Sequence, residues 1–243
     1  MNRAFFGDTR DLFKFDLVRH IMNAFPELAS FTFIPMLTED EKVSGTKKTA
    51  TKDLGQAQKN RKAGTKNHEL MVDMGHLQEI GDDLAYFEGI KSYFRKENII
   101  VDILHKDTFS HEHRENYFRE VFEKFPEKSL IFLDPDTGLE VKTPTQRHLL
   151  FDEVKKIYHH MDSSSILMIY QHIPRAVRKG YIERRCKDIA AITHSRPETI
   201  TDNEIIFFIL TKNPLLKTRL CAILGDYADK YQVLSACDCT EKE

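Results

Sequence analysis

Three acidic residues, Asp134, Asp136 and Glu140, follow a short hydrophobic run. Four of the five residues in that run, 129–133, are apolar, which is typical of a buried strand. Pro135 ends the strand because proline has no N–H for the ladder. Ligands of open α/β sheets bind at the carboxyl ends of strands, so chemistry is expected here. Grouped carboxylates suit Mg²⁺ and phosphodiester hydrolysis, whereas the alternative is that they only cap a helix or fix a turn.

The elements that must position these acids alternate along the chain. Hydrophobic runs predict strands at 31–37, 99–104, 129–133, 165–170 and 204–210, with a short last strand at 231–234. Apolar residues at helical spacing predict helices at 10–25, 68–97 with a break near Gly81, 110–125, 145–161 and 214–230, and a cationic helix after 174. This alternation predicts a single α/β domain over residues 1–243 with a mostly parallel sheet.

Four loops would then lie at strand carboxyl ends, at 38–40, 105–109, 134–140 and 170–174. In a parallel sheet these loops converge on one edge. They would bring Glu39, Asp107 and His172 to the three acids, and Asp11 or His172 would complete a Mg²⁺ site. For His172 alone, a hydrogen-bonded structural histidine is the alternative.

The formal net charge of −2 hides an asymmetry. Residues 41–66 contain eight Lys or Arg against two acids, a local charge of +6, and too few apolar residues to pack on their own. We therefore expect a mobile loop or a partly ordered insertion, which either binds nucleic-acid phosphates or is solvated surface. The candidate phosphate contacts are Lys47, Lys48, Lys59, Arg61 and Lys62, with Arg175 and Arg178 from the later cationic helix.

Asp11 and Lys14 lie three residues apart, on one side of the predicted first helix. The simplest interpretation is an intrahelical ion pair.

Several common functions are not indicated. The four cysteines form no CxxC pair, so we do not expect structural zinc. We expect a reduced, intracellular protein. No apolar run approaches membrane-spanning length and no signal-peptide core is present, so we expect a cytoplasmic protein without membrane contact. The chain lacks GxGxxG, P-loop, HExxH and GxSxG motifs.

Several segments, in the same order, resemble the methyltransferase family that makes N6-methyladenine at position 2030 of bacterial 23S ribosomal RNA. The signature G-N-x-A-D-V-x-K-H is similar to residues 7–15, Gly7-Asp8-Thr9-Arg10-Asp11-Leu12-Phe13-Lys14-Phe15. The family's D-G-F resembles residues 107–109, its L-I-D-P-P-Y residues 132–137, and its W-Y-P residues 169–171. Asp136 and Thr137 replace the second proline and the tyrosine. A group of bacterial proteins without an assigned activity resembles the chain more closely, through GDxxDxxK, LDPDxGLE and YQH motifs.

The resemblance implies a Rossmann-like fold that binds S-adenosylmethionine, with residues 41–97 as a basic loop and helical insertion after the first strand. The cofactor site would include Gly7, Asp8, Asp11, Lys14, Glu39 and Asp107. Asp134 and the Pro135 carbonyl would accept hydrogen bonds from the target amino group, with Asp136, Glu140 and His172 nearby. The hypotheses are therefore a methyltransferase-like enzyme acting on nucleic acid, a Mg²⁺-dependent phosphodiesterase or nuclease, and a non-catalytic binding protein on the same scaffold.

Overall fold

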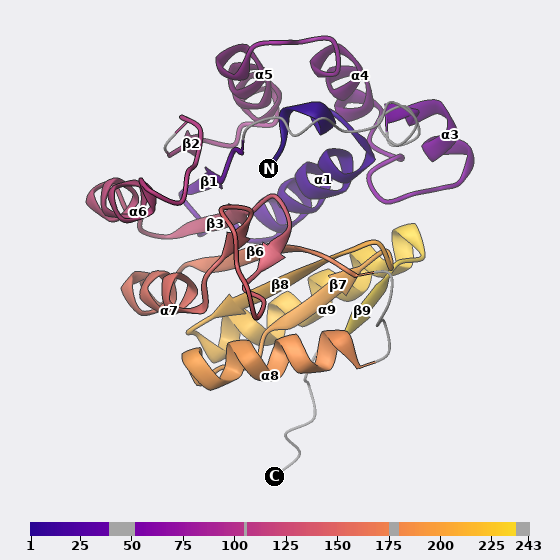
Figure 1. Ribbon diagram of the computed structural model, residues 1–243. Coiled ribbons are helices and arrows are strands. Elements are labelled where there is room, and N and C mark those ends of the chain that lie inside the picture. The colour runs from indigo at the N-terminus through magenta and orange to yellow at the C-terminus, as the bar shows by residue number, and fades with distance from the viewer. Residues whose placement is uncertain (39–51, 105, 175–179, 237–243) are drawn as a thin grey trace.

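A seven-stranded sheet lies between two layers of helices (Figure 1). The computed structural model describes residues 1–38, 52–104, 106–174 and 180–236. In their order across the sheet, the strands are β2 (Val101–Ile103), β1 (Ser30–Pro35), β3 (Ser129–Asp134), β6 (Ile166–His172), β8 (Ile205–Thr211), β7 (Glu198–Thr201) and β9 (Leu234–Ala236). A separate two-stranded ladder joins β4 (Gly138–Leu139) and β5 (His148–Leu149).

The first four strands of this order are parallel to one another. β8 is antiparallel to β6, β7 is antiparallel to β8, and β9 is antiparallel to β7. Five of the seven strands, namely β2, β1, β3, β6 and β7, therefore run in one direction. The prediction of an α/β fold with a mostly parallel sheet is confirmed.

Alternate side chains of each central strand face opposite helical layers. In β3, Leu130 and Phe132 pack with one layer, whereas Ile131 and Leu133 pack with the other. The first layer contains α1 (Thr9–Ala24), α4 (His68–Leu77), α5 (Asp83–Lys96) and α9 (Pro214–Tyr231). The second contains α6 (Arg114–Glu123), α7 (Phe151–His160) and α8 (Tyr181–Thr193). Burial on both faces explains why the central strands are continuous hydrophobic runs.

The described part of the basic segment, expected to be a mobile loop or a partly ordered insertion, is ordered and packs against α1. Residues 54–66 begin with the short helix α3 (Leu54–Lys59), and the side chains of Ala57 and Ala63 are buried. The Gly64 backbone lies so close to the Leu12 carbonyl that a Cβ would be 2.7 Å from that oxygen. The small residues of this segment allow its backbone to lie close to its neighbours. The low hydrophobic content of the segment did not indicate this packing. β7 was also missed, since Ile200 is its one large apolar residue.

The turn before α1 sets the position of the residues that follow. Asp8 is the N-cap, and its Oδ1 accepts hydrogen bonds from the backbone N–H groups of Arg10 and Asp11 at 2.8 and 3.1 Å. Gly7 precedes it with φ +70°, and a Cβ there would lie 2.6 Å from the Met74 carbonyl oxygen. This conformation and this contact both require glycine.

We predict that Gly7→Ala lowers the free energy of unfolding by about 1–3 kcal/mol, because it adds left-handed strain and a steric clash. Gly75→Ala is the matched control, since that glycine lies within α4 with nothing within 4 Å of the added Cβ. This control should be neutral or stabilising by up to about 1 kcal/mol. Urea unfolding measures the change in the free energy of unfolding for both variants. Equal effects of the two substitutions would contradict the requirement for glycine at position 7.

Candidate functional site

The carboxyl ends of β1 and β3 form a topological switch point. From β1 the chain continues to α4 and α5 in the first helical layer, whereas from β3 it continues to α7 in the second. The two strands are neighbours, with Pro35 in register with Asp134. Diverging connections at adjacent strand ends leave a crevice, which is the usual ligand site of such sheets.

A buried lysine occupies this crevice. Lys14 Nζ, from α1, lies 3.0 Å from Asp11 Oδ1 and 2.9 Å from Asp134 Oδ2. All three residues are at most 5% exposed. The lysine also lies over the Tyr170 ring, 4.3 Å from its centroid. Although burial lowers the pKa of Lys14, Asp134 and Asp11 outweigh it and raise that pKa well above its usual value.

Asp11 is a structural anchor. Its Oδ2 accepts hydrogen bonds from the Gly7 N–H at 3.0 Å and from the Tyr86 hydroxyl at 2.6 Å, while Oδ1 faces Lys14. It thereby joins the N-terminal turn, α1 and α5. The predicted ion pair of Asp11 and Lys14 is present, but it is shared with β3 and buried.

Asp134 is only half satisfied. Its Oδ2 pairs with Lys14, whereas its Oδ1 is buried with no hydrogen-bond partner among the described residues. Burial raises the pKa of Asp134, against the opposing effects of Lys14 and the Met1 amino group. The Met1 amino group donates to the backbone carbonyls of Met36 and Asp134 at 2.8 and 3.2 Å, and burial lowers its pKa to about 6.

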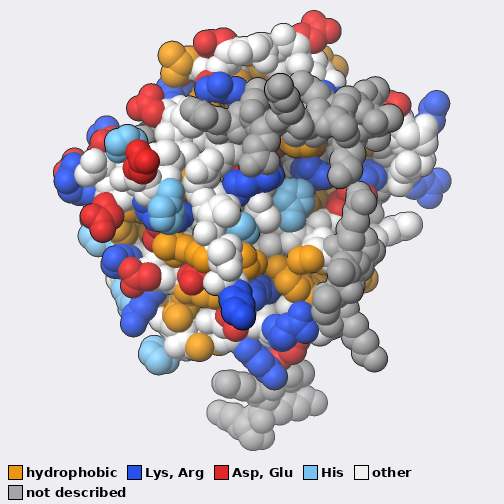
Figure 2. Space-filling view, in the orientation of Figure 1, with side chains coloured by type: hydrophobic (Ala, Val, Ile, Leu, Met, Phe, Trp, Pro, Cys, Tyr) orange, Lys and Arg blue, Asp and Glu red, His pale blue; other side chains and the backbone are white. Residues whose placement is uncertain are grey.

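A small polar cavity of about 30 Å³ lies at these groups, enough for one water or one small polar substituent. Its lining contains seven residues that the sequence predicted: Asp8, Asp11, Lys14, Asp134, Pro135, Asp136 and His172. The structure thus brings together the residues of the 7–15, 132–137 and 169–172 segments. Lys, Arg and His side chains are visible in the middle of the face shown in Figure 2.

The lining also contains the polar side chains of Asp136, Tyr170 and His172. Asp136 pairs with Arg147, and although burial opposes it, the Met1 amino group and Arg147 hold the pKa of Asp136 below its usual range. The Nε2 of His172 and the Tyr170 hydroxyl lie 2.9 Å apart. Burial, with Arg10 and Lys14 adding to it, lowers the pKa of His172 to about 3. His172 is therefore neutral at physiological pH.

Asp8 provides a second buried acceptor. Its Oδ2 has no hydrogen bond among the described residues and lies 3.7 Å from the Arg10 guanidinium. Burial and the neighbouring Asp11 raise the pKa of Asp8 to about 7.

The remaining candidates lie elsewhere. Glu140 accepts a hydrogen bond from the Phe151 N–H at 2.8 Å, so it caps the start of α7. Asp107 is exposed beyond the end of β2, Lys59 is exposed at the end of α3, and Arg61 is exposed just after it. Lys62 pairs with Glu204 at 3.2 Å. Glu39, Lys47, Lys48, Arg175 and Arg178 lie outside the described residues.

Sequence reasoning missed the Met1 amino group, Tyr86 and Arg147. No local pattern marks them, because each reaches its partner across the tertiary fold. Tyr170 could have been found, since it is part of the YQH segment.

Within the described ranges, no group of three or more His, Cys, Asp or Glu residues is placed to hold a metal ion. No helix in that same part of the chain has the length and apolar character needed to cross a membrane. Comparison with protein-family models, curated proteins and solved structures finds no match to this chain.

We predict that Lys14→Met lowers the free energy of unfolding by about 3–5 kcal/mol, because it leaves Asp11 and Asp134 buried without a cation. Lys96→Met is the control, since it breaks an exposed pair with Asp73 and should cost about 1 kcal/mol or less. Denaturant unfolding compares them. Similar losses of stability in the two variants would contradict a larger contribution from the buried ion cluster. Adding Asp134→Asn to Lys14→Met should recover part of the loss.

His172 predicts an acid sensitivity. Its pKa is lowered to about 3 in the folded protein from 6.5, so between these values the unfolded chain binds a proton that the folded protein does not. Its contribution to stability is therefore lost as pH falls from 6.5 towards 3. Over that window the wild type should lose up to about 1.4 kcal/mol per pH unit more than His172→Gln. Urea unfolding at several pH values tests this, with exposed His111→Gln as the control that follows the wild type. Identical pH profiles for the wild type and His172→Gln would contradict it.

Proposed function

We propose that the protein is an S-adenosylmethionine-dependent methyltransferase that acts on an amino group, with a nucleic-acid base as the acceptor. The observation that carries the proposal is Asp134 Oδ1, a fully buried carboxylate oxygen at the wall of the switch-point cavity with no hydrogen-bond partner among the described residues. A buried acceptor in this state calls for a hydrogen-bond donor. The cavity suits a substituent the size of an amino group.

The residues present fit the charged end of the cofactor. S-adenosylmethionine carries an ammonium and a sulfonium group. Asp8 Oδ2 lies 3.7 Å from the Arg10 guanidinium but accepts no hydrogen bond among the described residues, so it is a buried acceptor for such a cation. Asp107, exposed beyond β2, is available for ribose hydroxyls. Asp11 does not serve as a ligand, because both its oxygens are engaged by Gly7, Tyr86 and Lys14. When bound, the cofactor supplies an electrophilic methyl group.

The protein's own part is positioning and electrostatics. Lys14 fixes the orientation of the Asp134 carboxylate, so that Oδ1 accepts a hydrogen bond from the acceptor amino group. This hydrogen bond increases electron density on the nitrogen. The raised pKa of Asp134 also favours uptake of the proton that the nitrogen releases. His172 stays neutral and adds no positive charge that would repel a cationic cofactor.

The metal-dependent alternative is less well supported. Mg²⁺ would need free carboxylate oxygens from several residues. Lys14 already occupies one oxygen of Asp134, Arg147 pairs with Asp136, and Glu140 caps α7.

A nucleic-acid acceptor is proposed from charge. Lys59 and Arg61 are exposed on the insertion that follows β1, the strand that forms one wall of the crevice. Phosphates held there would leave a base to enter the site unpaired or flipped out. Phosphate contacts by these cationic residues would also make affinity dependent on salt.

The test is calorimetric titration with S-adenosylmethionine, followed by transfer of labelled methyl groups to RNA and DNA. We expect a dissociation constant below about 1 mM. Asp134→Asn should retain cofactor binding and lower the transfer rate at least about 100-fold, because the acceptor of the amino hydrogen bond is weakened.

Asp73→Asn, on the surface of α4, is the matched control and should transfer at the wild-type rate. Failure to bind the cofactor at millimolar concentration would overturn the proposal. Binding without transfer to any nucleic acid would instead favour a non-catalytic binding protein.

A further inference from the structure

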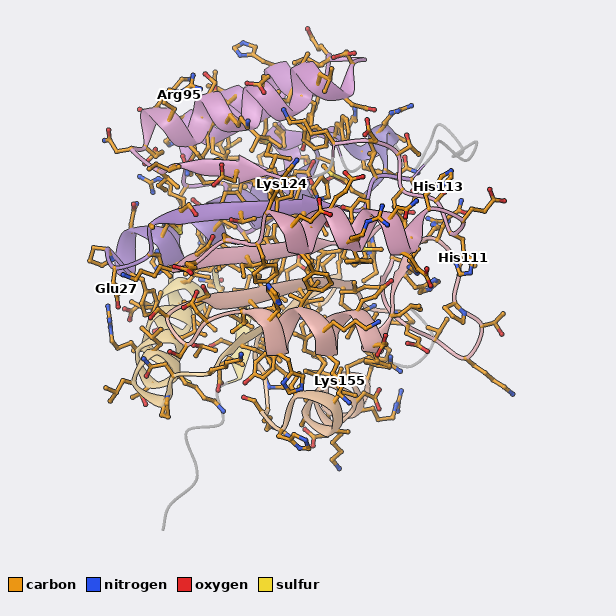
Figure 3. The ribbon with its side chains drawn as sticks, turned by 90° about the vertical axis from the view of Figure 1, so that its left-hand side faces the viewer. Glu27, Arg95, His111, His113, Lys124 and Lys155 are labelled. Atoms are coloured by element: carbon orange, nitrogen blue, oxygen red, sulfur yellow. The ribbon has the colours of Figure 1, made fainter. Side chains whose placement is uncertain are left out.

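A second, larger cavity lies between α6 and α7, on the opposite helical layer from Lys14. Its volume is about 480 Å³, and its walls are one side of α6 along its length and the N-terminal part of α7. Figure 3 shows α6 and α7 side by side in front of the strands, near the labelled Lys124 and Lys155. This volume is within the range of small-molecule sites.

Arg114, the first residue of α6, is at the wall of this cavity and only 7% exposed. Its guanidinium is held on three sides. Nη2 donates to the His148 carbonyl, Nε lies 3.0 Å from Glu153 Oε1, and the group lies over the Phe109 ring, 4.8 Å from its centroid. Nη1 is buried and has no hydrogen-bond partner among the described residues. A fixed guanidinium with a buried Nη1 that has no hydrogen-bond partner among the described residues is suited to a carboxylate or phosphate oxygen.

The rest of the wall is mainly apolar. Phe118, Phe122 and Leu150 line it, and none of the three is exposed. Formal charges in the lining balance, with Lys156 paired to Asp152 at 2.6 Å and Glu115 and Arg119 exposed. The charged group of the lining with unused hydrogen-bonding capacity is therefore Arg114. The start of α6 adds to it, because the N-cap His113 makes no side-chain capping bond.

We infer that the α6–α7 cavity binds a small amphipathic anion, with its carboxylate or phosphate group on Arg114 and its apolar body against Phe118, Phe122 and Leu150. The two acid groups share the chemistry that the guanidinium requires. The inference does not depend on the proposed methyl transfer, since no residue of the Lys14 cavity lines this one.

The test uses three probes of similar size: 3-phenylpropionate, 2-phenylethyl phosphate and the neutral 3-phenylpropanamide. Protein-observed NMR should show saturable shifts at α6 and α7, and at least one anion should bind about tenfold or more tightly than the amide. The tighter anion identifies the acid group. Equal affinity of all three probes, shifts elsewhere, or no binding at millimolar concentration would overturn the inference, and Arg114 would then be hydrated.

Variants separate recognition from folding. Arg114→Gln with Glu153→Gln removes both charges of the buried pair and should abolish the preference for anions. Phe122→Trp keeps Arg114 but narrows the cavity, so it should weaken both anions even if the double variant does not fold. Lys124→Gln, exposed and outside the lining, is the control and should bind like the wild type. Unchanged affinity in Phe122→Trp would contradict the location.

Discussion

The ion cluster of Asp11, Lys14 and Asp134 is the interaction on which the site depends. It joins the first helix to the tip of the third strand, 120 positions away in sequence. Removing three charges from water is costly, and their attraction offsets that cost only when geometry and hydrogen bonds are complete. Asp11 meets this condition fully and Asp134 only by half. Because Asp134 Oδ1 has no hydrogen-bond partner among the described residues, this structural cluster is also a candidate site.

The cluster and the sheet topology reinforce each other. At the β1–β3 switch point the connecting segments separate to opposite layers, and there the Lys14 side chain of α1 reaches the tip of β3. The Gly7 turn fixes the start of α1, and the Tyr86 hydroxyl of α5 donates a hydrogen bond to Asp11 Oδ2. The N-terminal turn and α5 therefore hold Asp11, and Lys14 from α1 orients the Asp134 carboxylate, as a site that works by positioning requires.

Hydrophobic runs buried on both faces made the central strands predictable, and the Asp134-Pro135 break located the strand end that carries the site. The i, i+3 spacing of Asp11 and Lys14 indicated their pairing. It could not indicate Asp134 as a third partner, because that contact depends on the order of strands. Glu140 shows the opposite error, since a carboxylate near a strand end can cap the next helix as readily as line a cavity.

The central claim is that Lys14 is a charged group shared by two carboxylates, leaving one Asp134 oxygen as an acceptor. NMR of the Lys14 side-chain ammonium tests it most directly, through couplings across hydrogen bonds between Nζ and the carboxyl carbons of Asp11 and Asp134. We predict couplings to both residues at neutral pH. An ammonium coupled to Asp11 alone, or a neutral Lys14, would contradict it.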